Sequence, residues 1–272
     1  MFKITNGRLD PASLARLAKF QEPVNQQDRY IDQVEMAQAQ WKTRRNDPVF
    51  ESVTDELSIM GWPGGYCHYC CGSEAGHIDH YQPKNLYPRL TFVWSNFIHS
   101  CERCNTRHKK DQCAVIVGEA EPLFVDLTRQ RRADVRRPRA GRIALINPRR
   151  EDPMELLRLD IGANGTFAFE PTHAPGTIEW YRADYTRRVL GLNTRAYLIR
   201  ERRGAYEAIV RFLKAYDRAA TNGDAAKKRR MLRNIREISH QSVWQELVRS
   251  HHRVPEVAGI FANCPELIRR RL

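Results

Sequence analysis

The sequence of 272 residues contains no apolar run long enough to cross a bilayer, and its N-terminus lacks the apolar core of a signal peptide. We therefore expect an intracellular, cytoplasmic protein. The pattern Gly-x4-Gly-Lys-Ser/Thr is also missing, so any dependence on ATP has to come from a partner. Internal repeats and low-complexity tracts are absent as well. These absences argue against a membrane protein, a repeat array and a P-loop ATPase.

Cysteine is scarce, and its number, seven, is odd. In an intracellular protein this argues against a disulfide framework. Four of the seven form two Cys-x2-Cys pairs, Cys67/Cys70 and Cys101/Cys104. Paired thiolates at this spacing form the all-sulfur tetrahedral set that zinc prefers in structural sites. We predict that these four cysteines hold a structural Zn2+; buried or redox-active cysteines are the alternative, which two such pairs disfavour.

Acidic residues are too few to balance the basic ones, and 45 Lys and Arg against 32 Asp and Glu give a net charge of +13. Residues 185–272 carry 20 basic and 8 acidic side chains, a net of +12, whereas residues 61–112 carry 6 and 4, a net of +2. Such a concentration of positive charge favours nucleic acid, because phosphate neutralisation releases counterions. A solvated basic face or an acidic protein partner is the alternative.

Helix signals dominate both ends of the chain. We interpret residues 1–60 as a helical N-terminal brace, which starts at Asp10-Pro11 and has a polar break at 22–25. Residues 183–272 have apolar side chains at i, i+3, i+4 and i+7, which predicts a basic helical lobe. Asp224 is expected to cap a helix in this lobe that continues to Ser250.

The middle of the chain has strand and turn signals instead. Residues 116–182 predict an irregular or β segment, with a short buried strand at 143–146 and a hairpin around the Asn-Gly turn at 164–165. Between this segment and the N-terminal brace lies a small module, residues 61–115. The predicted fold class is α+β, mostly helical, with the zinc-stapled module flanked by the brace and the basic lobe.

The module contains the candidate chemistry, because Asp79-His80 lies between the two cysteine pairs. An aspartate and a histidine at the end of a strand offer an oxygen ligand for a divalent cation and a nitrogen base. Hydrolysis of a phosphodiester uses both, the cation to stabilise charge and the base to activate water. Because Mg2+ retains several waters, two protein ligands can suffice. An Asp-His dipeptide alone is commonly a polar strand end, but this setting favours a nuclease.

The order Cys-x2-Cys, Asp-His, Asn, Cys-x2-Cys-Asn over residues 66–110 resembles the HNH, or ββα-metal, endonuclease family in its zinc-bearing form. The resemblance implies that Asp79 is a ligand of a catalytic Mg2+ or Mn2+ and that His80 is the general base. It implies that Asn96 holds the loop between the strands and orients the histidine. Asn105 would be the second protein ligand of the catalytic metal. The implied substrate is DNA, with RNA as the alternative.

Short motifs outside this stretch narrow the resemblance. A resemblance to the PtuB family, the HNH proteins of Septu anti-phage systems, rests on four short segments followed by an Arg-rich helix: LINP (145–148), EDP (151–153), TI (177–178) and LGLN (190–193). Proteins of the PtuB family are also found with some retrons. The resemblance implies a role in defence against phage. It also implies a partner, an ABC/SMC-type ATPase (PtuA-like), that controls the nuclease.

Several basic residues are candidates for contacts with nucleic acid. Lys84, Lys109 and Lys110 are predicted to contact phosphates, with a solvated surface role as the alternative. Nine arginines against one aspartate between 129 and 150 suit phosphate contacts as well as a surface loop. For the protein as a whole, the alternative to a nuclease is a non-catalytic four-cysteine zinc finger that binds nucleic acid or docks a partner. The Asp-His-Asn trio favours the nuclease, because a finger has no need of it.

Overall fold

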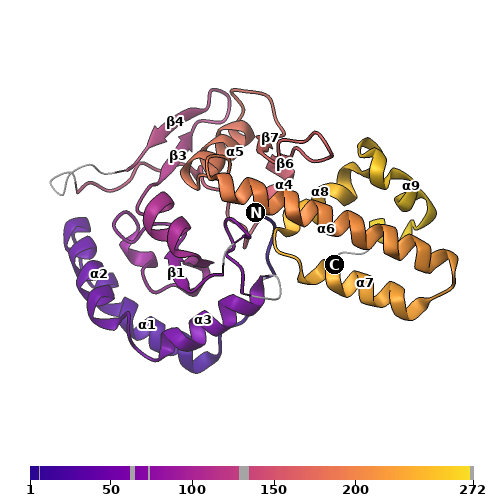
Figure 1. The fold of residues 1–272 in the computed structure, drawn as a ribbon. Coiled ribbons are helices and arrows are strands. Elements are labelled where there is room, and N and C mark those ends of the chain that lie inside the picture. Colours follow the sequence, from indigo (N-terminus) through magenta and orange to yellow (C-terminus); the bar gives the residue numbers. More distant parts are fainter. Residues whose placement is uncertain (6, 62–64, 73, 129–134, 270–272) are drawn as a thin grey trace.

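The computed structural model describes residues 1–5, 7–61, 65–72, 74–128 and 135–269 (Figure 1). These residues are mostly helical, with three small antiparallel sheets, which confirms the predicted fold class. Among them, no helix combines the length and the apolar character that crossing a bilayer requires. Residues 62–64, near the start of the predicted module, lie outside the described residues.

Three helices make up the N-terminal part: α1 (Pro11–Asn25), α2 (Tyr30–Arg44) and α3 (Val49–Met60). Asp10 caps α1 as predicted, since its carboxylate accepts a hydrogen bond of 2.9 Å from the backbone N–H of Ser13. The predicted break at 22–25 is wrong. Pro23 removes only its own N–H from the helix, the Gln26 N–H still bonds to the Glu22 carbonyl, and burial of Val24 favours the last turn.

The central hairpin is buried between two hydrophobic clusters. Strand β1 (His77–His80) pairs antiparallel with β2 (Phe97–Ser100), with Asp79 opposite Ile98 and His80 opposite Phe97. Because successive strand residues point to opposite faces, Phe97 joins the cluster formed with α1 and α3, while Ile98 joins the larger cluster on the other side. The N-terminal helices therefore brace one face of the hairpin.

The middle of the chain forms two further small sheets. The first has the order β4-β3-β5, and its strands are β3 (Ala114–Val117), β4 (Leu123–Asp126) and β5 (Arg142–Ile143). The short helix α4 (Pro153–Leu156) leads into the predicted hairpin, which is confirmed: β6 (Leu157–Leu159) pairs antiparallel with β7 (Phe169–Pro171). Strand β3 crosses the expected module boundary at 115, so the module and the middle segment share a sheet.

The strand predicted at 143–146 ends early. Residues 144–146 are buried, but pairing with β3 stops after the Ala144 N–H bonds to the Ala114 carbonyl at 2.9 Å. The Ile146 N–H bonds instead to the hydroxyl of Thr186 at 2.9 Å, a residue of α5 (Ile178–Val189). Packing against α5 therefore replaces the sheet partner that the sequence pattern suggested.

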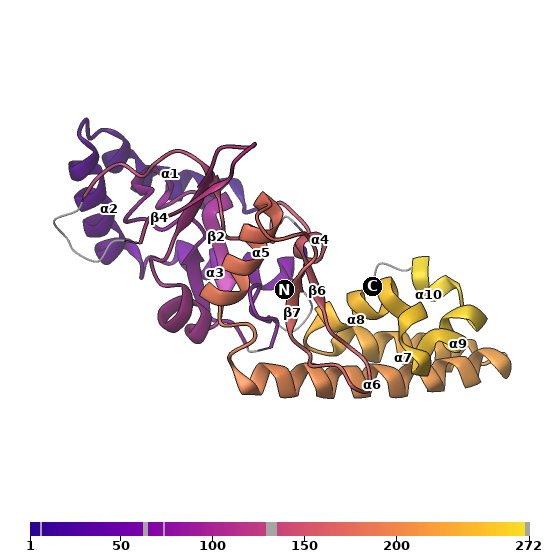
Figure 2. The same cartoon turned by 90° about the horizontal axis from the view of Figure 1, so that it is seen from above.

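The C-terminal lobe is helical, as predicted, and lies at the opposite end of the molecule from α1 and α2 (Figures 1 and 2). Its elements are α6 (Ala196–Thr221), α7 (Ala225–Glu237), α8 (Gln241–Ser250), α9 (Pro255–Asn263) and α10 (Glu266–Arg269). The long helix α6 runs along the lobe, and α7 packs beside it. The carboxylate of Asp224 caps α7 as predicted, by accepting a hydrogen bond from the Lys227 N–H at 2.8 Å.

The continuous helix predicted from Asp224 to Ser250 is wrong, because the chain breaks at His240 between α7 and α8. His240 has a left-handed backbone (φ 58). Its N–H bonds to the carbonyl of Cys71 at 2.9 Å, and its ring lies 3.1 Å from the carboxylate of Glu201. The break thus attaches the lobe to the cysteine-bearing module.

Candidate metal centre and active site

The two Cys-x2-Cys pairs meet at one end of the β1–β2 hairpin. The four sulfur atoms of Cys67, Cys70, Cys101 and Cys104 lie within 4.8 Å of one another, and all four side chains are buried. Cys70 Sγ and Cys101 Sγ are 3.9 Å apart. Four thiolates about 2.3 Å from a tetrahedral zinc would lie about 3.8 Å from each other. The cluster can therefore hold a metal such as zinc, as the spacing predicted.

Arg195 supports this cluster from a distant part of the chain. Its side chain is buried, and both terminal nitrogens of its guanidinium lie 3.5 Å from Cys104 Sγ. Burial by itself would lower the pKa of Arg195, but the negative charges of Cys104 and Cys70 outweigh it and raise that pKa. A cation here offsets part of the negative charge of four thiolates. Sequence reasoning missed this residue, whose only signal is its position just after the segment LGLN.

We expect the substitution Arg195→Gln to weaken metal binding about 10- to 100-fold, which is the usual effect of removing a hydrogen-bond partner of a metal ligand. Competition with a chromophoric zinc chelator measures this affinity. Arg200→Gln, on the exposed side of α6, is the matched control and should bind zinc as the wild type does. Equal affinities for both variants would contradict the role of Arg195.

Asp79 lies at the buried end of β1, where it already holds a cation. Only 3% of Asp79 is exposed, and its carboxylate lies 3.0 Å from the ammonium of Lys109 and 2.7 Å from the hydroxyl of Tyr69. Burial raises the pKa of Asp79, and the charge of Lys109 counteracts part of that rise. The Lys109 ammonium also donates to the His80 carbonyl at 2.6 Å. A divalent cation at Asp79 would have to replace or join this ammonium.

The ring of His80 is held in one orientation. Its Nε2 lies 2.8 Å from the Thr91 carbonyl, and Trp41 packs edge-on against it at 4.5 Å between ring centroids. Because a carbonyl only accepts, Nε2 carries the proton and the lone pair of the neutral ring is on Nδ1. Burial lowers the pKa of His80 to about 3, with the charge of Lys84 adding to the shift. The imidazole is therefore neutral at physiological pH, the protonation state of a base.

Asn96 connects the two ends of the segment between β1 and β2. Its side-chain oxygen accepts a hydrogen bond of 2.8 Å from the Gln82 N–H, and its nitrogen donates 3.0 Å bonds to the carbonyls of Gln82 and Leu90. Leu90 directly precedes Thr91, whose carbonyl fixes the His80 ring. These contacts are the ones that a residue orienting His80 needs.

The remaining predicted site residues lie after the second cysteine pair or, in the case of Lys84, in the segment between β1 and β2. Asn105 is half-buried in the helical segment η3 (Arg103–Lys109), which has the wider hydrogen-bond pattern of a π-helix, and Lys109 lies about one turn further along. Lys110 is exposed, and the Lys84 ammonium lies 5.9 Å from the centroid of the Trp41 ring. Lys109 is fully buried against Asp79, so the predicted phosphate contact by Lys109 does not fit this structure. The sequence alone does not indicate which of the two adjacent lysines, Lys109 or Lys110, is buried.

Comparison with known proteins gives one limited match. No protein-family model matches the chain, and no solved structure matches it. Over 55 residues the chain is 34% identical to Septu protein PtuB of Bacillus thuringiensis, which covers 18% of this chain and 21% of that protein. The aligned part is thus about a fifth of either protein. Over that stretch, the chain is similar to a Septu protein.

Proposed function

We propose that this protein is a divalent-metal-dependent HNH endonuclease that hydrolyses phosphodiester bonds in nucleic acid, with DNA as the main substrate. One observation carries the proposal: the neutral ring of His80, fixed by the Thr91 carbonyl, follows Asp79 on a strand that a four-cysteine cluster braces. A structural zinc finger needs the cysteines but has no use for a fixed, neutral imidazole at the position directly after a buried aspartate.

Each of the residues in the site has a separate role in this proposal. His80 would accept a proton from the attacking water at Nδ1, because Nε2 is committed to the Thr91 carbonyl. Asn96 keeps that carbonyl in place through its bonds to Gln82 and Leu90. The four-cysteine cluster anchors the start of β1 and the end of β2, so that the strands do not separate.

A catalytic Mg2+ or Mn2+ would be held by Asp79 and Asn105, an oxygen set that suits a hard cation. The Lys109 ammonium, 3.0 Å from the Asp79 carboxylate, holds the place that the metal would have to take or share. When bound, the metal would supply positive charge that stabilises the phosphate in the transition state.

The wider role that we infer is that of an anti-phage nuclease under the control of an ABC/SMC-type ATPase of the PtuA kind. Its support is the similarity to Septu protein PtuB, which spans 18% of the chain. Purifying the protein from its native host and identifying what accompanies it tests this proposal.

A second candidate function is a non-catalytic zinc module that binds nucleic acid or docks a partner. The observation in its favour is that Asp79 is buried and that both of its carboxylate oxygens already have hydrogen-bond donors, the Lys109 ammonium on both and the Tyr69 hydroxyl on one. Plasmid nicking with Mg2+ or Mn2+ separates the two. Cleavage by the wild type supports the nuclease, and no cleavage even with the co-purified partner supports the zinc module.

The basic lobe offers a surface for nucleic acid at a distance from the site. On α7, Met231, Leu232 and Ile235 are buried, which leaves an opposite, exposed face of four arginines: Arg229, Arg230, Arg233 and Arg236. Replacing all four with glutamine should reduce the slope of log K against log salt by about 0.9 for each phosphate that these arginines neutralise on duplex DNA. Fluorescence anisotropy measures the slope.

The matched control replaces the same four arginines with lysine, which keeps the charge and should keep most of the slope. If the glutamine variant binds DNA with the salt dependence of the wild type, the basic face of α7 serves a protein partner instead.

A further inference from the structure

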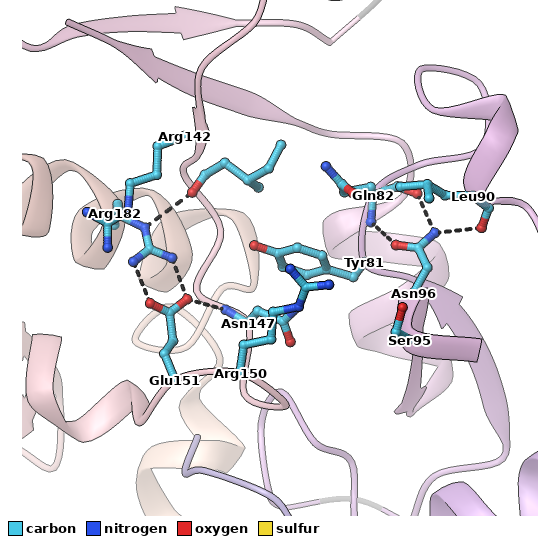
Figure 3. A pocket seen from close by; sticks show the side chains of 11 residues that line it. Tyr81, Gln82, Leu90, Ser95, Asn96, Arg142, Asn147, Arg150, Glu151 and Arg182 are labelled. Atoms are coloured by element: carbon cyan, nitrogen blue, oxygen red, sulfur yellow. Dashed lines mark hydrogen bonds and ion pairs between the residues drawn. The ribbon is translucent and has the colours of Figure 1, made fainter. Parts of the chain in front are cut away.

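A pocket of about 350 Å3 opens immediately after the end of β1 (Figure 3). One side is formed by Gln82, Ser95 and Asn96 from the segment between β1 and β2. The opposite side is formed by Arg142, Arg150 and Glu151, from β5 and the turn before α4. Its volume is at the lower end of the range of about 300–1,000 Å3 for small-molecule pockets. No role for it follows from the cysteine cluster or from the roles proposed for Asp79 and His80.

Two acceptors in the pocket wall, the Glu151 carboxylate and the Asn96 side-chain oxygen, are already occupied. The carboxylate of Glu151 receives two bonds from the guanidinium of Arg182, at 2.6 and 2.5 Å, and a third from the Asn147 N–H at 2.9 Å. The side-chain oxygen of Asn96 accepts from the Gln82 N–H. Arg182 is buried and neutralised by Glu151, so this pair adds no net charge to the pocket.

What remains available in the pocket is positive charge. The Arg142 side chain is 55% exposed, and its ion-pair partner Glu179 is at the long distance of 4.0 Å. Arg150 is exposed and, within the part of the chain that the structure describes, forms no ion pair. The Ser95 hydroxyl is exposed on the facing wall. Two guanidinium groups and a hydroxyl, beside a carboxylate that Arg182 already neutralises, favour an anion.

We propose that this pocket binds a phosphate group, with Arg142 and Arg150 as its cationic contacts. The guanidinium fork suits phosphate oxygens better than a single ammonium does, because it donates two parallel hydrogen bonds. Resting on the proposed nuclease function, we assign the phosphate to the backbone of the nucleic-acid substrate beside the bond that is cut. The reason is connectivity: Tyr81 in the pocket directly follows His80, and Asn96 belongs both to the pocket wall and to the loop that fixes the His80 ring.

The test compares DNA binding by the wild type, Arg142→Ala, Arg150→Ala and the double alanine variant, without added divalent cation so that no cleavage occurs. Because both arginines contact one phosphate, the double alanine variant should lower the slope of log K against log salt by about 0.9, and each single substitution should lower it by part of that amount. A double lysine variant should recover most of the slope. Arg29→Ala, which removes one exposed arginine from the start of α2, should leave the slope unchanged. Thermal unfolding verifies that all variants are folded.

The Tm in the presence of inorganic phosphate or of a nucleoside monophosphate shows whether the pocket binds free phosphate or the backbone of the substrate. If either raises the Tm of the wild type but not of the double alanine variant, while DNA binding is equal in both, the pocket binds free phosphate and the assignment to the substrate backbone is overturned. An unchanged salt slope together with no effect of phosphate on Tm overturns the whole proposal. Plasmid cleavage is assayed separately with the co-purified partner present, so a reduced slope together with no cleavage keeps the phosphate pocket and rejects the nuclease.

Discussion

Plasmid cleavage by the His80→Ala variant should be about 10²- to 10⁴-fold slower than by the wild type, with Mg2+ or Mn2+ present. This range is the usual contribution of a positioned general base. The lone pair that the variant loses is on Nδ1, since Nε2 donates to the Thr91 carbonyl. Conversion of supercoiled plasmid to nicked and linear forms measures the rate.

Because the His80 ring packs against Trp41 and Phe97, the variant also needs a test of folding. Its zinc content and Tm provide one, and His80→Gln provides a second variant that keeps a polar side chain of similar size. The control is His77→Ala, three residues earlier at the start of β1, where the side chain is exposed. Cleavage at the wild-type rate by folded His80→Ala would remove this histidine from the mechanism.

Replacing Cys104 with serine should abolish zinc binding and unfold the module. Structural zinc in finger peptides contributes an apparent free energy of about 10–16 kcal/mol at pH 7, which exceeds the total stability of most domains. The cluster belongs to the larger hydrophobic core, and Arg195 at the start of α6 packs against Cys104, so loss of zinc should also destabilise the basic lobe. Metal analysis should find one zinc per chain in the wild type and none in the variant.

The matched control for this experiment is Cys264→Ser, because Cys264 is also buried but lies outside the four-cysteine cluster. Cys264→Ser should retain zinc and a cooperative thermal transition. A Cys104→Ser variant that unfolds at the wild-type temperature with no metal bound would show that the cysteines serve packing rather than zinc.

Local patterns of the sequence were sufficient for a large part of this fold. Asp10 and Asp224 cap their helices because a cap depends on the residue and the next three positions only. The hairpin of β6 and β7 forms around Asn164-Gly165 as the strand signals on either side predicted, although residues 160–168 connect the two strands in place of a two-residue turn. The grouping of the four cysteines follows from their spacing, since two x2 pairs have little other use.

Other features were decided by packing between distant residues, which no local pattern contains. The break of the helix at His240 depends on Cys71 and Glu201, and the early end of β5 depends on Thr186. The same holds for the ion pair of Lys109 with Asp79, where a lysine in a basic run is buried by its position on η3 and not by its neighbours in sequence.

The sequence by itself therefore determined the chemical groups available to this protein: four cysteines that can hold a metal, and the Asp-His pair on which the proposed hydrolysis rests. Only the tertiary structure decided which charges meet. It placed Arg195 at Cys104, Lys109 at Asp79, and Arg142 and Arg150 at one pocket. The physical reason is range: caps, turns and knuckles form within a few residues, whereas the energy of a charge depends on every group that folding brings near it.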